Sequence, residues 1–265
     1  MSQATLANAI KMLGGTGEVT AFFLVLARVT PLFVLAPLFS SKMLSMRVRG
    51  VVAVALCIGL TPVAMHGQHI PSSPLPVAGA IVVQLLVGLA FAFAVSAVFA
   101  AIDAAGHLVD NASGFSFGAT VDPINGNQGG TFTSFYGLVG TLIFLAIGGD
   151  AWTLRGLART FTLVPLTKSP QIASMVGGAV SAFASITTAA VEVAAPVLLA
   201  LLITDVAFGM VSRVVPQLNV FAVGFPMKVG VALLTVGLSL PFVAGWMSNQ
   251  IGSSVSTALA SLHVS

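Results

Sequence analysis

Charged, amide and proline residues between Ala207 and Val229 interrupt an otherwise apolar stretch of the sequence, AFGMVSRVVPQLNVFAVGFPMKV. These residues are two cations, two amides and two prolines, namely Arg213, Pro216, Gln217, Asn219, Pro226 and Lys228. A polar group in hydrocarbon costs several kcal/mol unless a partner satisfies it. The stretch is therefore expected to face protein or water, and its chemistry is that of ion pairing and hydrogen bonding.

Asp205, Gly209 and Arg213 are spaced four residues apart, which places them along one face of a helix. Pro216 is expected to end this helix, because proline lacks the N–H that a helix interior requires. The guanidinium of Arg213 would then lie near the last carbonyls of the helix, which have no partners within the helix. The alternative is that Arg213 is an ordinary charge at the edge of a loop, reaching water.

A short non-helical connection is predicted at Pro216–Phe225, because Pro226 has the backbone angle suited to the first turn of a helix. Lys228 would follow in that first turn, where the helix dipole does not favour a cation. Lys228 is therefore expected to have a carboxylate or carbonyl partner. The candidate carboxylates are those of Asp205, Glu192 and Asp122. The alternative is again a solvated charge at a loop edge.

A second unusual stretch, DNASGFSFGATVDP, runs from Asp110 to Pro123. Its aromatic and turn-forming residues are Gly114, Phe115, Phe117, Gly118, Asp122 and Pro123. Glycines beside aromatic residues permit a loop that places bulky rings in a narrow space. The alternative interpretation is a plain hairpin whose aromatic residues belong to the core.

Catalytic signatures are weak in the sequence, which contains no Walker motif, HExxH or GxGxxG pattern. The four histidines are scattered, and His66 and His69 lie in a proline-rich segment without a cysteine or acid nearby. We therefore expect no catalytic residue, no metal site and no cofactor. The net charge of +3 comes from few residues and suggests no nucleic-acid partner.

The composition is that of a membrane protein, or of a subunit buried in a membrane-associated assembly. Of the 265 residues, 57% are hydrophobic and 6% are charged, whereas soluble domains carry about 25% charged residues. No polar linker divides the chain, so one domain is predicted over residues 1–265. Cys57 lies in an apolar run and is expected to be a small core residue.

The apolar segments are long enough to cross a bilayer as helices, which takes about 20 residues. They are Val19–Phe39, Val51–Met65, Leu75–Ile102, Phe132–Gly149, Ile172–Thr204 and Phe225–Met247. Pro196 is expected to bend or break the fifth segment. If the spans alternate, the basic loops at 42–49 and 155–168 fall on opposite sides, against the positive-inside rule. Either a hairpin lies within 103–131, or the chain does not cross the bilayer in the ordinary way.

At these same residues the sequence closely resembles the FliR family, the flagellar type III export-gate subunits whose injectisome counterparts are called SctT. The resemblance covers nearly the full length. It is carried by ARVTPLFVLAPLF at Ala27–Phe39, the following MRVRG, the GFSFGATVDP stretch, FLAIGGD at Phe144–Asp150, TFTLVP at Thr160–Pro165, and LLITDVAFGMVSRVVPQLNVFAVGFPMK at Leu201–Lys228. The FAVGFP motif resembles flagellar members of the family more than injectisome members.

Two departures from the family pattern stand out. Family members often carry an acid before the LL-x-G of the third segment, where this sequence has Gln84. They often show a second aromatic residue three positions after the one that matches Phe117, where this sequence has Thr120. The first departure weakens any requirement for a carboxylate at that site, and the second suggests a slimmer plug loop.

The resemblance implies an all-α, membrane-associated subunit built from helical hairpins, in a helical assembly that lies largely above the bilayer plane. Such an arrangement would explain why the positive-inside rule fails. In the family the loop matching Gly114–Asp122 lies at the closed constriction of the export channel, so the stretch from Gly114 to Pro123 is the expected plug. The residues expected at the assembly interface are Arg28, Asp205, Arg213, Pro216, Gln217, Asn219, Phe221 and Lys228.

The implied function is that of a non-enzymatic channel subunit in the bacterial inner membrane, at the flagellar basal body. The implied partners are FliP-like and FliQ-like subunits, FlhB-like and FlhA-like export components, and exported unfolded flagellar proteins. One alternative is an SctT-like subunit of a virulence-type secretion system. Another is a small-solute secondary transporter, which predicts paired helix interruptions. The sequence shows only a loose repeat of this kind, between Arg28-x-x-Pro31 and Arg213-x-x-Pro216.

Overall fold

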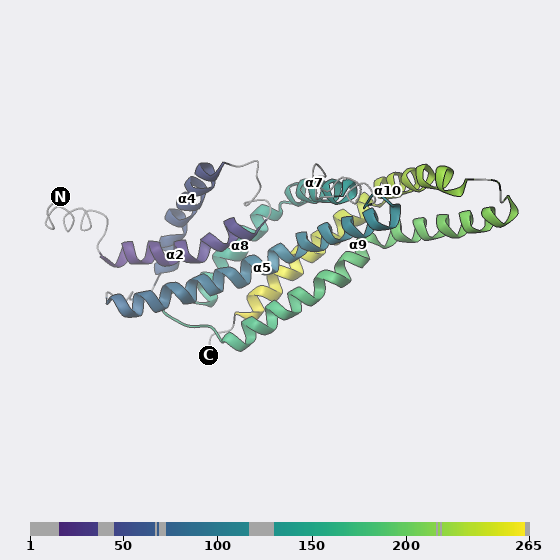
Figure 1. The fold of residues 1–265 in the computed structure, drawn as a ribbon. Helices are drawn as coiled ribbons and strands as arrows, with labels where there is room; N and C mark the ends of the chain where they lie inside the picture. The colour runs from purple at the N-terminus through teal and green to yellow at the C-terminus, as the bar shows by residue number, and fades with distance from the viewer. Residues whose placement is uncertain are drawn as a thin grey trace. The chain divides into compact units, whose positions relative to one another are not determined.

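The computed structural model describes residues 16–36, 45–66, 68, 73–116, 130–215, 217 and 219–262. Within these ranges the secondary structure is helical, with no strand, and the elements follow one another as Figure 1 shows. The helices are α2 (Thr16–Leu35), α4 (Met46–Met65), α5 (Pro74–Ser113), α7 (Thr131–Ala146), α8 (Gly149–Leu163), α9 (Ile172–Val214) and α10 (Val220–Ser261). The predicted all-α fold is confirmed.

Five helices of the described chain, α2, α4, α5, α9 and α10, are long and apolar enough to cross a membrane. Helices α7 and α8 pass the same test only as a pair, and they are bent by 70° at the short break between them. Gly148 lies in this break with a φ of +70°, a backbone conformation that side chains other than glycine disfavour. The composition and the helix lengths together identify a membrane protein.

Two of the helices run further than the sequence predicted. The third apolar segment does not end at Ile102, because α5 continues to Ser113. Ala105 and Val109 keep one side of this extension buried, four residues apart as a helix requires. Pro196 does not break α9, which is one helix of 43 residues. Ala194 and Val197 are fully buried beside this proline.

The predicted connection at Pro216–Phe225 is wrong in its second half, because α10 begins at Val220. Asn219 explains the early start: its Oδ1 accepts a hydrogen bond from the backbone N–H of Ala222 at 3.2 Å. An asparagine in this position satisfies one of the free N–H groups at a helix start. Pro226 and Lys228 consequently lie inside α10 and not in its first turn.

The chain divides into two compact units. The first unit comprises Met1–Ser96, Gly149–Ala182 and Ile251–Ser265, and the second comprises Ala97–Gly148 and Phe183–Gln250. Helices α5, α9 and α10 each contribute to both units. The expectation of one domain over residues 1–265 stays a prediction.

In the first unit α5 crosses α2 at close range. A Cβ atom added to Gly88 would clash with the backbone carbonyl of Arg28, so only glycine allows this approach. Gly156 of α8 is similarly enclosed, since an added Cβ would meet Val255 Cγ1 at 2.8 Å and Phe91 Cζ at 2.9 Å. These small residues let the helices approach closely around a buried centre.

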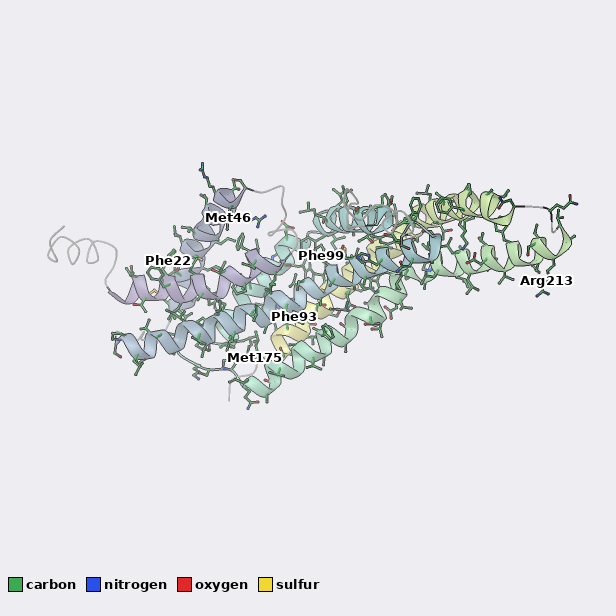
Figure 2. The ribbon with its side chains drawn as sticks, viewed as in Figure 1. Phe22, Met46, Phe93, Phe99, Met175 and Arg213 are labelled. Carbon is green, nitrogen blue, oxygen red and sulfur yellow. The ribbon has the colours of Figure 1, made fainter. Side chains whose placement is uncertain are left out.

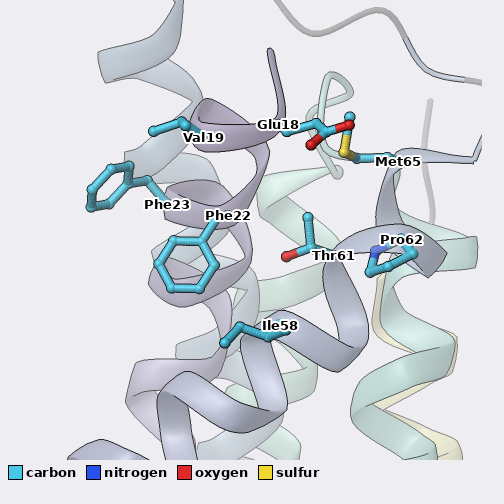
Figure 3. Close-up of a pocket in the computed structure, with 8 residues that line it drawn as sticks. All are labelled: Glu18, Val19, Phe22, Phe23, Ile58, Thr61, Pro62 and Met65. Atoms are coloured by element: carbon cyan, nitrogen blue, oxygen red, sulfur yellow. The ribbon is translucent and has the colours of Figure 1, made fainter. Parts of the chain in front are cut away.

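The first unit also has a hollow of about 620 Å³ between α2 and α4 (Figure 3). The residues around it are Glu18, Val19, Phe22, Phe23, Ile58, Thr61, Pro62 and Met65. The Thr61 hydroxyl donates to the carbonyl of Cys57 at 2.6 Å within its own helix. The lining is therefore largely apolar, and its residue types suggest no catalytic chemistry.

The second unit contains two antiparallel helix pairs. Helix α7 runs back along α5: the rings of Phe99 and Phe144 are 5.1 Å apart, and Gly140 lies against Ile102. Helix α10 runs back along α9, where Lys228 forms an ion pair with Asp205. These two pairs are the helical hairpins that the family resemblance implied.

Candidate gate segment and its anchors

Asp110 of α5 caps the N-terminus of α7. Its Oδ1 accepts a hydrogen bond from the backbone N–H of Phe132 at 2.9 Å. Its Oδ2 accepts from the backbone N–H of Thr133 at 2.9 Å and from the Thr133 hydroxyl at 2.7 Å. Residue 130, which precedes α7, is a glycine without a capping side chain. Asp110 therefore supplies from another helix the acceptor and the negative charge that a helix N-terminus favours.

Two glycines make room for this contact. A Cβ atom on Gly130 would overlap the carboxylate of Asp110, and one on Gly106 would lie 2.5 Å from the Thr133 Cα. Asp110 itself is 2% exposed. The carboxylate is thus held in a closely fitted site, in which both of its oxygens have partners.

Phe115 is held by two aromatic neighbours within the same unit. Its ring centroid lies 5.4 Å from that of Phe132, edge to face at 83°, and 6.0 Å from that of Phe225 on α10. Such arrangements are the favourable ones for aromatic rings. Gly114 has a φ of +90°, and an added Cβ would touch the Phe225 ring at 3.5 Å. Glycine is therefore required at the end of α5, and Phe115 is an anchor within the chain.

The connection between α5 and α7 is consequently fixed near both of its ends. Asp110 and Phe115 hold the end that leaves α5, and both contact Phe132 at the start of α7. Of the predicted plug, Gly114 and Phe115 belong to this anchored base. Phe117, Gly118, Asp122 and Pro123 lie outside the described residues, and so does Thr120. Their role in closing a channel stays a prediction.

Lys228 forms an ion pair with Asp205, one of the three carboxylates expected as its partner. The two side chains are 25% and 51% exposed, so the ion pair lies at the surface of the second unit. Glu192, another candidate, instead accepts a hydrogen bond from Nε1 of Trp246 at 3.0 Å. The third candidate, Asp122, lies outside the described residues.

The other polar residues of this hairpin point outward or cap a helix. Figure 2 shows Arg213 at the end of α9, where it is exposed. It makes no hydrogen bond or ion pair with any residue the structure describes. Gln217 is also exposed, and Asn219 caps α10. Pro216 and the side chain of Phe221 lie outside the described part. An interface role for these residues stays a prediction.

Arg28 lies inside the first unit and not on a surface that another subunit could contact. It is 0% exposed. Its Nε and Nη2 both donate to Oε1 of Gln84, the former at 2.6 Å. Nη2 also donates to the carbonyl of Val164 at 2.8 Å, and the guanidinium carbon lies 4.4 Å from the centre of the Phe161 ring. The expected interface role of Arg28 is therefore corrected to an internal one.

Gln84 extends the same buried network. Its Nε2 donates to the carbonyl of Leu166 at 3.0 Å, and the backbone N–H of Leu166 donates to Oε1 of Gln68 at 2.8 Å. The network ties α2 and α5 to the segment that follows α8. Every partner of Arg28 that the structure describes is neutral, so its charge is solvated by amide, carbonyl, hydroxyl and aromatic groups.

Among the described residues, no group of three or more histidine, cysteine, aspartate or glutamate side chains is placed to hold a metal ion. The arrangement instead offers buried hydrogen bonding, aromatic anchoring and a surface ion pair. The fold and these contacts define an all-α membrane protein whose characteristic region is a connection anchored between hairpins.

Comparison with known proteins identifies the family. Residues 19–254 match the bacterial export proteins, family 1, and the chain belongs to this family. Among its relatives is the flagellar biosynthetic protein FliR of Pectobacterium carotovorum subsp. carotovorum, 30% identical over 230 residues, which cover 85% of this chain and 86% of the relative. FliR of Escherichia coli (strain K12) is 27% identical, over 84% and 85% of the two chains.

A further relative bears a different name. The surface presentation of antigens protein SpaR of Shigella sonnei is 28% identical over 79% of this chain and 80% of its own length. The resemblance to FliR and to its injectisome counterparts, stated from the motifs, is confirmed by these matches.

Proposed function

We propose that this chain is a structural subunit of the flagellar type III export gate and helps to form the pore for unfolded flagellar proteins. Membership of the bacterial export family and the similarity to FliR proteins of several bacteria support this proposal. The subunit would act as a channel component without catalytic chemistry of its own. It would reside in the inner membrane, at the flagellar basal body.

The observation that carries the gating role is the anchored base of the α5–α7 connection. Asp110 and Phe115 hold this base against Phe132, so the connection leaves α5 from a fixed point. A hydrophobic constriction gates a pore by excluding water through dry apolar contact. In this proposal Phe115 is the anchor, and Phe117 is the ring that closes the pore.

The proposed partners are FliP-like and FliQ-like subunits, with FlhB-like and FlhA-like export components nearby. The α9–α10 hairpin supports an assembly, because Arg213 and large apolar side chains are exposed together near its tip. Val214 is 81% exposed and Met210 is 60% exposed. Neighbouring subunits would cover such a mixed surface.

A tagged copy of the chain in a strain that lacks its own gate subunit tests the assignment. Motility and secretion of flagellar proteins should be restored, and mass spectrometry of the purified complex should find FliP-like and FliQ-like subunits. A chain that purifies as a well-behaved monomer, with no effect on secretion, would contradict the proposal.

Phe117→Ala tests the gating role directly. Truncating a ring in a closed constriction leaves a void, so the membrane should become leaky to small ions while the complex still assembles. Ion conductance is measured in cells that produce the whole assembly. Phe135→Ala is the matched control, because Phe135 is a 42% exposed aromatic of α7 outside the plug stretch. Normal assembly with unchanged conductance in Phe117→Ala would exclude the plug role.

A second candidate is a virulence-type secretion system, which the similarity to SpaR favours. Complementation of a flagellar deletion and of an injectisome deletion separates the two, since the matching system should be restored more fully. The small-solute transporter predicts uptake by the isolated chain in lipid vesicles, and its absence there would remove that alternative.

A further inference from the structure

The exposed side of α5 is polar in the second unit. Asp103, His107 and Asn111 are spaced four residues apart, which places them in one line along the helix. All three side chains are exposed, and none forms a hydrogen bond with another residue in the described ranges. The opposite side is apolar and buried, with Ile102 at 1% and Val109 at 0% exposed. This is the pattern of a helix with one face in water.

Helix α7 adds a second polar line beside the first. Ser134, Gly137 and Thr141 are spaced three and four residues apart, so they also share a face. Gly137 lies next to Asp103, because an added Cβ would be 3.2 Å from the Oδ1 of Asp103. Ser134 is exposed, and Thr141 is partly exposed. Since α5 and α7 are antiparallel, these residues lie side by side on one surface of the pair, which we call the α5–α7 polar face. The exposed Leu138, between Ser134 and Thr141, is an apolar member of the same surface.

The length of α5 leaves part of it outside hydrocarbon. A helix of 40 residues is about 60 Å long, twice the roughly 30 Å thickness of a hydrocarbon core. Ionisable residues at membrane depth are costly and in general line water-filled paths. The exposed Asp103 and His107 thus mark the part of the helix that contacts water.

The polar face ends at the candidate gate. Asn111 precedes Gly114 by three residues, and Ser134 follows Phe132 by two. Phe132 is the residue that both Asp110 and Phe115 contact. A passage that runs along the polar face would therefore lead directly to the anchored base of the plug.

We propose that the α5–α7 polar face lines the aqueous passage and contacts the unfolded polypeptide as it moves toward the gate. This proposal rests on the proposed export function. An unfolded chain presents backbone N–H and C=O groups along its whole length. Short polar side chains offer both donors and acceptors to these groups, and the weak contacts that they form let a chain bind and leave.

Cysteine labelling tests whether the α5–α7 polar face is accessible to water. Cys57 is the sequence's one cysteine and is buried, so Cys57→Ala provides the background. Three single variants, Asp103→Cys, His107→Cys and Ser134→Cys, are made in this background. Membranes that contain each variant are permeabilised, so that a charged maleimide reaches both sides of the membrane. Leu142→Cys is the control, since Leu142 is 57% exposed on another side of α7. The polar-face cysteines should react at least about tenfold faster, because a thiolate forms more readily in water.

Photo-crosslinking identifies the occupant. A benzophenone amino acid is placed at His107 or at Leu142 in cells whose export substrate is stalled by a folded fusion partner. The His107 position should cross-link to the stalled polypeptide, whereas the Leu142 position should not. Cross-links from His107 to a stationary subunit alone would overturn the proposal, as would equal labelling rates at the polar face and at Leu142.

Measuring the secretion of flagellar proteins by the same variants tests the export function separately from the polar face. Variants that secrete normally but fail both tests would overturn the polar face and leave the export role intact. Secretion that continues unchanged without the chain would overturn the export role, whatever the labelling rates.

Discussion

The two parts of α5 have opposite distributions of polarity. In the first unit the outer side is apolar, with Val82, Leu85 and Leu89 exposed, while Gln84 is fully buried. In the second unit Asp103 and His107 are exposed. One continuous helix therefore meets two environments: its first part suits hydrocarbon or apolar protein, and its second part suits water.

The buried polar centres differ in the same way. In the first unit Arg28 is solvated by neutral groups around Gln84. In the second unit Asp110 is buried against the N-terminus of α7, whose dipole and free N–H groups compensate a negative charge. The first centre holds helices together at a crossing, and the second fixes the start of the α5–α7 connection. Substitutions at each centre should therefore have separable effects.

Removal of Arg28 should have the largest effect. Arg28→Ala leaves the Gln84 amide and the Val164 carbonyl buried without their partner, at about 1–3 kcal/mol for each unsatisfied group, and the lost side chain also leaves a cavity. The amount of intact complex on a native gel should fall sharply. Arg155→Ala is the control, because Arg155 is an exposed cation on α8. Wild-type levels of complex in Arg28→Ala would show that the network is dispensable.

Asp110→Ala should have the next largest effect and should alter gating. It leaves the N–H groups of Phe132 and Thr133 without acceptors, at a cost of about 1–3 kcal/mol. Because these groups hold the base of the plug, ion leakage should rise more than the loss of complex explains. Glu18→Gln removes an exposed carboxylate of α2, in the first unit, and should leave the ion conductance unchanged. Equal leakage in both variants would argue against a clamp.

Gln84→Glu should stabilise the first unit, since it gives Arg28 a negative partner. Charge-assisted hydrogen bonds are stronger than neutral ones, and after loss of the bond to Leu166 the net gain is about 1 kcal/mol. The measurement is thermal unfolding of the complex in detergent. Gln84→Leu, which removes the acceptor entirely, should instead lower the unfolding temperature. A lower temperature in both variants would mean that amide geometry matters more than charge.

The smallest effects on chain stability are expected at the α9–α10 hairpin. Lys228→Ala breaks a surface ion pair, which is worth under about 1 kcal/mol. Arg213→Ala removes an exposed cation and should leave the chain's own stability unchanged. We nevertheless expect Arg213→Ala to impair assembly and motility more than Lys228→Ala does, because only a guanidinium bridges several acceptors. Normal motility with Arg213→Ala would identify a solvated loop charge.

The sequence predicted the helical class, and it predicted a partner for Lys228 with Asp205 as one of three candidate carboxylates, because both expectations follow from local chemistry. An apolar run of membrane length is expected to form a membrane-spanning helix. A cation within such a run needs a carboxylate partner. Asp205 is the charged residue of the preceding helix that an antiparallel hairpin brings to Lys228. The helix boundaries were less predictable, because Asn219 caps α10 and the helix begins at Val220, six residues before the expected start at Pro226.

The roles of Arg28 and Asp110 could not be read from the sequence. Arg28 is separated from Gln84 by 56 residues, and Asp110 from Phe132 by 22. Such contacts depend on which helices cross, and residue spacing carries no information about that. A signal for Asp110 did exist: a carboxylate in an apolar segment, followed by a helix start without a capping residue at Gly130. The sequence contains no comparable signal for the contact between Phe225 and Phe115, because Phe225 is one of many apolar residues in its segment.

The clamp between Asp110 and α7 would also make the proposed gate modular. In the described ranges α5 and α7 meet through residues up to Phe115 and from Gly130 onward, so the two ends of the connection are held together. Lengthening a chain segment whose ends are already held together costs only about 0.6 kcal/mol for each doubling. Evolution, or a protein engineer, can therefore change the length and the bulk of the connection to set the width of the opening, while the scaffold keeps its shape.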